Sequence, residues 1–257
     1  MKKVMMTLLL ASYQMLVSAQ VMIESDPLME NFPFQIKLVD EFMSRLNGDT
    51  SIDGSSRELD LASLFHKDVY MGAGKRYAED FAHEVDEPAK YIDFKDSTWY
   101  AVAECAVEIR KGKEEKVTIV LKTENCGEFQ YKWVMAHAYA DCLDLTPDRC
   151  NPGLKIPPTD NEVNFMSLSA IEPKNVLNYT SRGFAPDRES VLFAMMYYGL
   201  MKIKYVDRLS YVFTDIAGYR LSVEYFPGES RNSGWLISDI RPLMKNVDSI
   251  PFDRIVL

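Results

Sequence analysis

The sequence from Trp99 to Tyr139 decides the fold class, because its apolar residues recur at every second position. It reads WYAVAECAVEIRKGKEEKVTIVLKTENCGEFQYKWVMAHAY. Alternation of this kind puts apolar side chains on one face of a strand and polar side chains on the other. The three apolar sets are Trp99, Ala101, Ala103, Cys105, Val107 and Ile109; Val117, Ile119 and Leu121; and Phe129, Tyr131, Trp133, Met135, His137 and Tyr139. With turns at 111–113 and 124–128, the stretch predicts a three-stranded antiparallel meander whose apolar sets face one core.

Helical spacing precedes this meander, and a second pattern of helix and strands follows it. The segments before it predict helices at 34–46, 57–66 and 77–85. The segments after it predict a strand at 165–171, a helix at 187–198, and strands at 203–213, at 219–225 and from 235 onward. Both halves therefore have the pattern of a helix followed by a three-stranded meander, which is typical of an α+β protein with helices on one face of a curved sheet.

A proline-rich stretch separates the two halves. Residues 141–160 contain four prolines and few apolar residues, so they predict a linker or a long ordered loop. We therefore expect two consecutive cone-like lobes, one at 20–140 and the other at 161–257. The alternative is that both halves form one continuous sheet, with 141–160 as an excursion from it.

The first 19 residues have the pattern of a secretory signal peptide. Lys2 and Lys3 precede an apolar stretch from Val4 to Val17, and Ala19 ends a compact tripeptide that a signal peptidase could cleave. This apolar stretch is shorter than the ~20 residues that span a bilayer. We therefore expect export, a periplasmic or extracellular location, and no membrane span after cleavage.

Charge and composition exclude several function classes. The chain of 257 residues carries 29 Lys and Arg against 38 Asp and Glu, a formal net charge of −9, so it lacks the basic surplus of nucleic-acid binders. It contains neither a glycine-rich phosphate loop nor a Cys-x-x-Cys pair, and its three histidines lack metal-ligand spacing. We therefore expect no nucleic-acid partner, no cofactor and no metal.

Three short motifs resemble a known superfamily. They are FMSRLNG at 42–48, DLASLF at 60–65 and GWLISDI at 234–240. These segments resemble uncharacterised exported bacterial proteins with a nuclear transport factor 2-like, cystatin-like cone. The resemblance implies a helix pair that closes a bent sheet over a conical pocket. Members include isomerases, dehydratases, polyketide cyclases and proteins with only a binding or accessory role, so the resemblance is compatible with an enzyme or a binder.

The four cysteines predict one local disulfide. Cys142 and Cys150 flank a seven-residue turn, and an exported protein reaches an oxidising compartment, so we expect these two to pair. The predicted turns place Cys105 opposite Ile119, and Cys126 about 20 Å away along the sheet, which is too far for a disulfide between them.

His137 is the only acid–base candidate. A Cys105–His137 pair on one sheet face would activate a thiol, but the predicted register separates the two by about 13 Å. We expect Trp99, Tyr131, Trp133 and His137 to line any pocket of the first lobe.

These observations favour a non-catalytic binding or accessory protein over an enzyme. Its partner would be a protein, a glycan or a small apolar ligand. The alternative is a small-molecule isomerase, hydrolase or cyclase with its pocket in one lobe.

Overall fold

The computed structural model describes most of the chain after residue 38. The described residues are 39–49, 56–110, 112–128, 130–145, 165–181, 183–228 and 233–243. The expected signal peptide at 1–19, residues 34–38 of the first predicted helix and most of the predicted linker at 141–160 lie outside them, so these predictions are untested.

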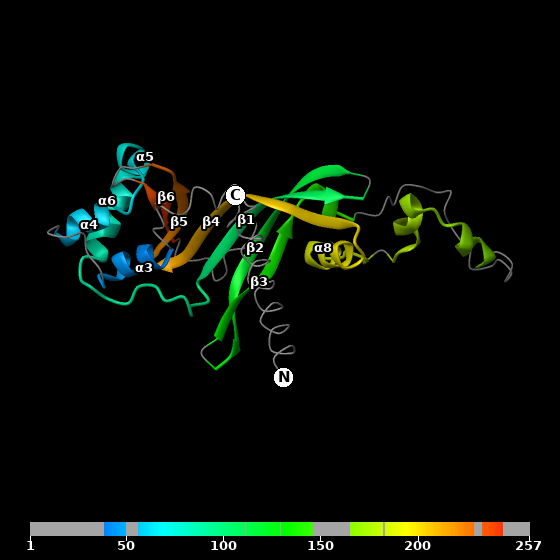
Figure 1. Cartoon of the computed structure of the whole chain (residues 1–257), viewed down its shortest axis with the longest axis horizontal. Coiled ribbons are helices and arrows are strands. Elements are labelled where there is room, and N and C mark those ends of the chain that lie inside the picture. The colour runs from blue at the N-terminus through cyan, green and yellow to red at the C-terminus, as the bar shows by residue number, and fades with distance from the viewer. Residues whose placement is uncertain are drawn as a thin grey trace, which may run out of the picture. The chain divides into compact units, whose positions relative to one another are not determined.

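Six strands make up the sheet, and the fold class is α+β as the sequence predicts (Figure 1). The strands are β1 (Trp99–Ile109), β2 (Lys113–Gly127), β3 (Gln130–Tyr139), β4 (Met201–Ile216), β5 (Tyr219–Phe226) and β6 (Gly234–Pro242). Their order is β3-β2-β1-β4-β5-β6, and the pairs β1/β2, β2/β3 and β5/β6 are antiparallel. A single sheet was the alternative that the sequence left open.

Short helices complete the fold. The α-helices are α3 (Val39–Asn47), α4 (Arg57–Ala62), α5 (Lys67–Met71), α6 (Lys75–Glu84) and α8 (Arg188–Tyr197). The 3₁₀ segments are η1 (Asp141–Leu143), η2 (Met166–Ala170) and η3 (Pro173–Tyr179). The helices predicted at 77–85 and 187–198 are confirmed as α6 and α8, whereas α5 was not predicted.

The strand predicted at 165–171 is wrong, because this segment forms η2. The Ser169 hydroxyl donates a hydrogen bond of 2.8 Å to the Met166 carbonyl, a local bond that competes with strand pairing. Phe165, Met166 and Leu168 are all exposed, so the alternation of apolar residues does not mark a buried sheet face here.

Two compact units divide the described chain. The first unit combines the described residues up to Phe94 with those within Phe213–Lys245, and the second contains the described residues of Lys95–Val212. Helices α3 to α6 therefore pack with β5, β6 and the last residues of β4. The division into lobes at 20–140 and 161–257 stays a prediction.

The core of the first unit forms where α3 to α6 meet the C-terminal strands. Its fully buried large side chains include Leu46, Leu61, Leu64, Phe65, Phe81, Phe213, Leu221, Leu236 and Ile237. The Phe81 ring lies edge-on to Phe65 and to Tyr219, with centroid separations of 6.1 and 5.5 Å. These contacts join α6 to β5 and explain why distant segments of the chain form one unit.

The outer edge of β6 is covered by the chain that follows α4. The Ile237 amide donates to the Leu64 carbonyl at 2.7 Å, and the His66 amide donates to the Ile237 carbonyl at 2.9 Å. An exposed strand edge is a template for unwanted pairing, so this parallel bridge protects the middle of β6.

Arg57 caps two helices of the first unit. Its guanidinium donates to the Arg45 and Leu46 carbonyls at the end of α3, at 2.6 and 2.5 Å. It also donates to the Val85 carbonyl after α6, at 3.1 Å. The last carbonyls of a helix lack hydrogen-bond donors within the helix, so the Arg57 guanidinium supplies donors to both helix ends.

The core of the second unit lies between α8 and one face of the sheet. Its buried residues are Ala103, Cys105, Val107, Val117, Ile119, Ala138, Leu143, Val191, Leu192 and Met201. Val191 and Leu192 are the buried residues of α8, and they cover strand residues that the alternation places on one face. Cys105 is therefore a small core side chain, only 3% exposed.

The register of β1 with β2 differs from the predicted one by two residues. Cys105 pairs with Val117, whereas the sequence analysis placed it opposite Ile119. The strands extend to the pair Ile109 and Lys113, and Gly112 has φ +78° in the turn between them. This tight turn shortens the connection and shifts the partner of every β1 residue.

A bulge in β3 separates His137 from the aromatic residues before it. Val120 pairs with His137, but Leu121 pairs with Met135, so one extra residue lies between these two pairs on β3. The prediction that one face carries every second residue from Phe129 to Tyr139 is therefore wrong. His137 shares a face with Val120, and the opposite face carries Trp133 and Met135.

Candidate functional site

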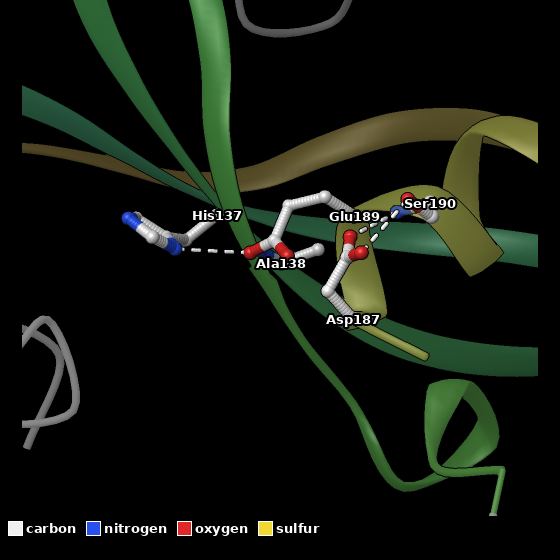
Figure 2. A network of polar contacts seen from close by, with 5 residues as sticks. All are labelled: His137, Ala138, Asp187, Glu189 and Ser190. Atoms are coloured by element: carbon white, nitrogen blue, oxygen red, sulfur yellow. Dashed lines mark hydrogen bonds and ion pairs between the residues drawn. The ribbon is translucent and has the colours of Figure 1, made fainter. Parts of the chain in front are cut away.

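The N-terminus of α8 begins a polar network on the second unit. The Asp187 carboxylate accepts hydrogen bonds from the Ser190 amide at 2.7 Å and from its hydroxyl at 2.9 Å (Figure 2). This side chain is the N-cap of α8, which its position before Arg188 and Glu189 predicts. The hydrogen bond from the Ser190 amide lowers the pKa of Asp187 below its ordinary value.

Glu189, in the first turn of α8, connects this helix to β3. Its Oε1 atom lies 3.0 Å from His137 Nδ1 and accepts a hydrogen bond of 3.1 Å from the Ala138 amide. Figure 2 shows the Glu189 side chain extended from α8 to these two residues. β3 is an edge strand, so its outward amides have no neighbouring strand to donate to and need other acceptors. Glu189 is the acceptor for one of these amides, that of Ala138.

Arg188 makes a second connection, to the chain that follows β3. Its guanidinium donates to both carboxylate oxygens of Asp144, at 2.6 and 3.0 Å, and lies 5.7 Å from the centroid of the Tyr139 ring. The hydrogen bond from Arg188 lowers the pKa of Asp144. A carboxyl group with a lowered pKa stabilises the folded state above its unfolded pKa. That contribution is lost as the pH falls through the folded pKa.

The His137–Glu189 pair has one chemical capability. A carboxylate beside an imidazole fixes the orientation of the ring, and an oriented imidazole can act as a general acid or base. The side chains of His137 and Glu189 are 35% and 23% exposed, so solvent reaches both. The pair is accessible, and it also has a structural role through the Ala138 amide.

Aromatic side chains form a second feature of this unit, which we call the aromatic face: Trp99, Trp133 and Tyr211. The Trp99 and Trp133 rings meet edge to face with centroids 4.6 Å apart. Tyr211 lies 5.7 Å from Trp99 and 6.2 Å from Trp133. Trp99 is 4% exposed, whereas Trp133 is 38% exposed, so a buried ring supports an exposed one. Burial raises the pKa of Tyr211.

The structure brings together some of the predicted site residues and not others. Trp99 and Trp133 are in contact, and Tyr131 lies on the same strand two residues before Trp133. His137 lies beyond the bulge on the other face, so the four residues do not line one pocket.

Sequence reasoning missed two residues of these sites. Tyr211 comes from β4, far along the chain from Trp133, and no local pattern links the two. Glu189 was recognised only as part of a helix start. The available sequence signal for Glu189 was an acidic residue in the first turn of a helix. This signal does not by itself indicate a contact with β3, because the helix dipole also favours negative charge there.

The described cysteines do not form disulfides with one another. Cys105 is buried, Cys126 is exposed and Cys142 is half-buried. Burial raises the pKa of both Cys105 and Cys142, which disfavours the reactive thiolate. Cys150 lies outside the described residues, so its pairing with Cys142 remains a prediction.

The described part of the chain contains no group of three or more His, Cys, Asp or Glu side chains that could hold a metal ion. Within the same ranges, no helix has both the length and the apolar character needed to cross a membrane.

Comparison with protein-family models, with curated proteins and with solved structures finds no match for this chain. The candidate sites therefore rest on their own geometry.

Replacing Glu189 with alanine is expected to destabilise the second unit. The substitution removes the acceptor of the Ala138 amide and of His137, and such losses cost about 1–2 kcal/mol at a half-buried position. Urea unfolding would measure it. The matched control is Glu124→Ala, at an exposed glutamate of β2, where we expect a change below about 0.5 kcal/mol. Equal effects of the two substitutions would contradict the bridging role of Glu189.

Proposed function

We propose that this chain is an exported, non-catalytic binding protein whose ligand stacks on Trp133. The observation that carries the proposal is an exposed tryptophan held in place by the buried Trp99 ring. Large aromatic side chains with few rotatable bonds supply contact area at a low entropic cost, which favours them at binding surfaces. The support from Trp99 and Tyr211 preorganises Trp133 before a ligand arrives.

The groups around Trp133 favour a glycan among the possible ligands. The β2–β3 register places Thr123 opposite Trp133 and Asn125 opposite Tyr131, so all four side chains share one face. An amide, a hydroxyl and a phenol beside an indole suit a ligand with one apolar face and a rim of hydroxyls. A sugar ring has this character, because its apolar face can stack on the indole while its hydroxyls form hydrogen bonds with polar side chains beside it.

The proposed location and fold family complete this hypothesis. The pattern at residues 1–19 supports export to the periplasm or the cell exterior. The resemblance of three motifs to the nuclear transport factor 2-like cone supports a binding or accessory role equally with an enzymatic one. The α+β arrangement of helices and curved strands is compatible with that resemblance.

Binding of oligosaccharides tests the proposal. Calorimetric titration of the full chain with a panel of neutral and acidic oligosaccharides is expected to identify a ligand. Trp133→Ala is expected to weaken its affinity at least about tenfold, because it removes the stacking surface.

The control for this experiment is Phe193→Ala. Phe193 is also an exposed aromatic residue of the second unit, 48% exposed, but it lies on α8. We expect it to change the affinity less than about twofold. A panel without a ligand, or equal losses in both variants, would contradict glycan binding at Trp133.

A second candidate function is supported by the His137–Glu189 contact of 3.0 Å. A small-molecule isomerase, hydrolase or cyclase would use His137 as its acid or base, with Glu189 orienting the ring. Because His137 and Trp133 lie on opposite faces, the two functions are separable. An activity lost in His137→Ala and retained in Trp133→Ala would favour the enzyme.

A further inference from the structure

A backbone hydrogen bond joins two chain connections at one end of the second unit. The Arg110 amide, in the β1–β2 turn, donates to the Leu200 carbonyl at 2.8 Å, in the connection from α8 to β4. The Leu200 amide in turn donates to the Met195 carbonyl of α8, also at 2.8 Å. We call residues 110, 112–116 and 197–204, which these bonds hold together, the basic tip.

The basic tip has the opposite charge to the rest of the chain. Its described residues include five basic and two acidic ones, in a chain whose formal net charge is −9. Each of its acidic residues is already paired, Glu114 with Lys204 and Glu115 with Lys113. Outside the tip, Asp207 pairs with Lys116 at 3.5 Å, and Glu108 is an exposed neighbour on β1.

Two basic side chains of the tip are available to a partner. Arg110 and Lys202 are exposed, and within the described residues neither has an acidic partner. A surplus of unpaired positive charge on an acidic protein attracts an anionic partner and orients its approach.

Among the described residues of the second unit, the same tip carries the most exposed aromatic side chains. Tyr197 is 85% exposed and Tyr198 is 73% exposed, with their rings edge to face and centroids 5.2 Å apart. Tyr197 ends α8, and Tyr198 is its C-cap residue. Their exposure is not explained by packing within the described part of the unit.

We infer that the basic tip docks on the surface of a membrane that contains anionic lipid. Tyrosine rings are favoured at the level of the lipid headgroups, and lysine and arginine beside them bind the negative surface. The tip consists of two short connections, whereas a standard protein interface buries about 800 Å² on each partner. A few aromatic and basic side chains are sufficient for a membrane surface, so lipid is a better match than a protein.

This docking differs from the ligand site at Trp133 and from membrane spanning. Interfacial binding needs neither a long apolar helix nor deep insertion. The binding energies of aromatic side chains among the headgroups and of basic side chains on anionic lipid add together. It would hold an exported binding protein close to a membrane while its aromatic face takes up a ligand. Failure of glycan binding would leave the docking untouched, and the reverse also holds.

Vesicle co-sedimentation tests the inference. The full chain is mixed with vesicles of phosphatidylcholine alone, or of phosphatidylcholine and phosphatidylglycerol in equal parts. We expect binding to the mixed vesicles, little binding to the neutral ones, and release as sodium chloride is added. All variants keep residues 1–19, so any contribution of this segment is common to every comparison.

Three variants separate the contributions. Arg110→Gln with Lys202→Gln is expected to weaken binding to the mixed vesicles about thirtyfold, and Tyr197→Ser with Tyr198→Ser about tenfold. The matched control is Lys122→Gln with Lys132→Gln, which removes the same charge from exposed lysines of β2 and β3. We expect this control to change binding less than about threefold.

The inference is overturned if the full chain does not bind the mixed vesicles, or binds neutral vesicles equally well. It is also overturned if the control weakens binding as much as the Arg110 and Lys202 variant, because net charge alone would then explain the result. The substituted residues are all exposed, so thermal unfolding is expected to be unchanged in each variant.

Discussion

Replacing Phe81 with alanine is expected to lower the free energy of unfolding by about 3–5 kcal/mol. Phe81 is fully buried and contacts Phe65 and Tyr219 edge to face. The substitution removes a large apolar side chain and leaves a cavity between α6 and the strands that follow residue 213. Urea or thermal unfolding of the full chain would measure the loss.

The control for Phe81 lies on the same helix. Tyr77 is 40% exposed, and Tyr77→Ala is expected to cost less than about 1 kcal/mol. A double-mutant cycle between Phe81 and Tyr219 should then give a coupling energy of about 0.5–1.5 kcal/mol. If Phe81→Ala destabilises no more than Tyr77→Ala, α6 does not pack on β5, and the composition of the first unit is wrong.

Replacing Asn47 with alanine is expected to cost about 2–4 kcal/mol. Asn47 ends α3 and is 8% exposed. Its Oδ1 atom accepts from the Tyr91 and Ile92 amides at 2.9 and 3.0 Å, and its Nδ2 atom donates to the Ile92 carbonyl at 2.8 Å. Alanine would leave these backbone groups without partners in a buried position, so the cost exceeds that of one exposed hydrogen bond.

Asn125 supplies a comparison for this second prediction. It is an exposed asparagine on β2 whose Oδ1 atom accepts from the Gly127 amide at 3.0 Å. Asn125→Ala is expected to cost less than about 1 kcal/mol, because water can replace the lost bond. Urea unfolding of both variants decides between the two roles. Equal costs would show that Asn47 does not anchor the chain before β1.

The alternation of apolar residues predicted β1, β2 and β3, because a long uninterrupted period of two is typical of a half-buried strand. It could not predict the bulge in β3. The sequence from Tyr131 to Tyr139 alternates without interruption, yet one extra residue between Met135 and His137 changes which face His137 occupies. A bulge depends on the partner strand and on packing, and neither is visible in a single strand.

The register of β1 with β2 and the wrong strand prediction at 165–171 also depend on features that the local sequence does not specify. A two-residue shift between β1 and β2 follows from the length of one turn, which the charged residues around Gly112 leave undetermined. In η2, the apolar residues alternate as in a strand, but no neighbouring strand pairs with them and serine bonds to the local backbone.

Only half of each candidate site could be predicted from the sequence. Trp133 and Trp99 belong to one meander, so their alternation predicted a shared face, and they are in contact. Tyr211 and Glu189 join these sites from segments more than 50 residues away from their partners on β3. Such contacts depend on how α8 and β4 return to the sheet, which local patterns do not specify.

The fluorescence of Trp133 during a titration with the oligosaccharides tests the proposed glycan site most directly. Replacing Trp235 with phenylalanine keeps the supporting Trp99 ring and leaves Trp133 as the only exposed tryptophan of the chain, since Trp99 is 4% exposed. If the sugar stacks on Trp133, its emission shifts to shorter wavelength in a saturable manner and becomes protected from acrylamide. If calorimetry shows that the same chain binds a sugar while this emission stays unchanged, the ligand binds elsewhere and the proposed function of Trp133 is wrong.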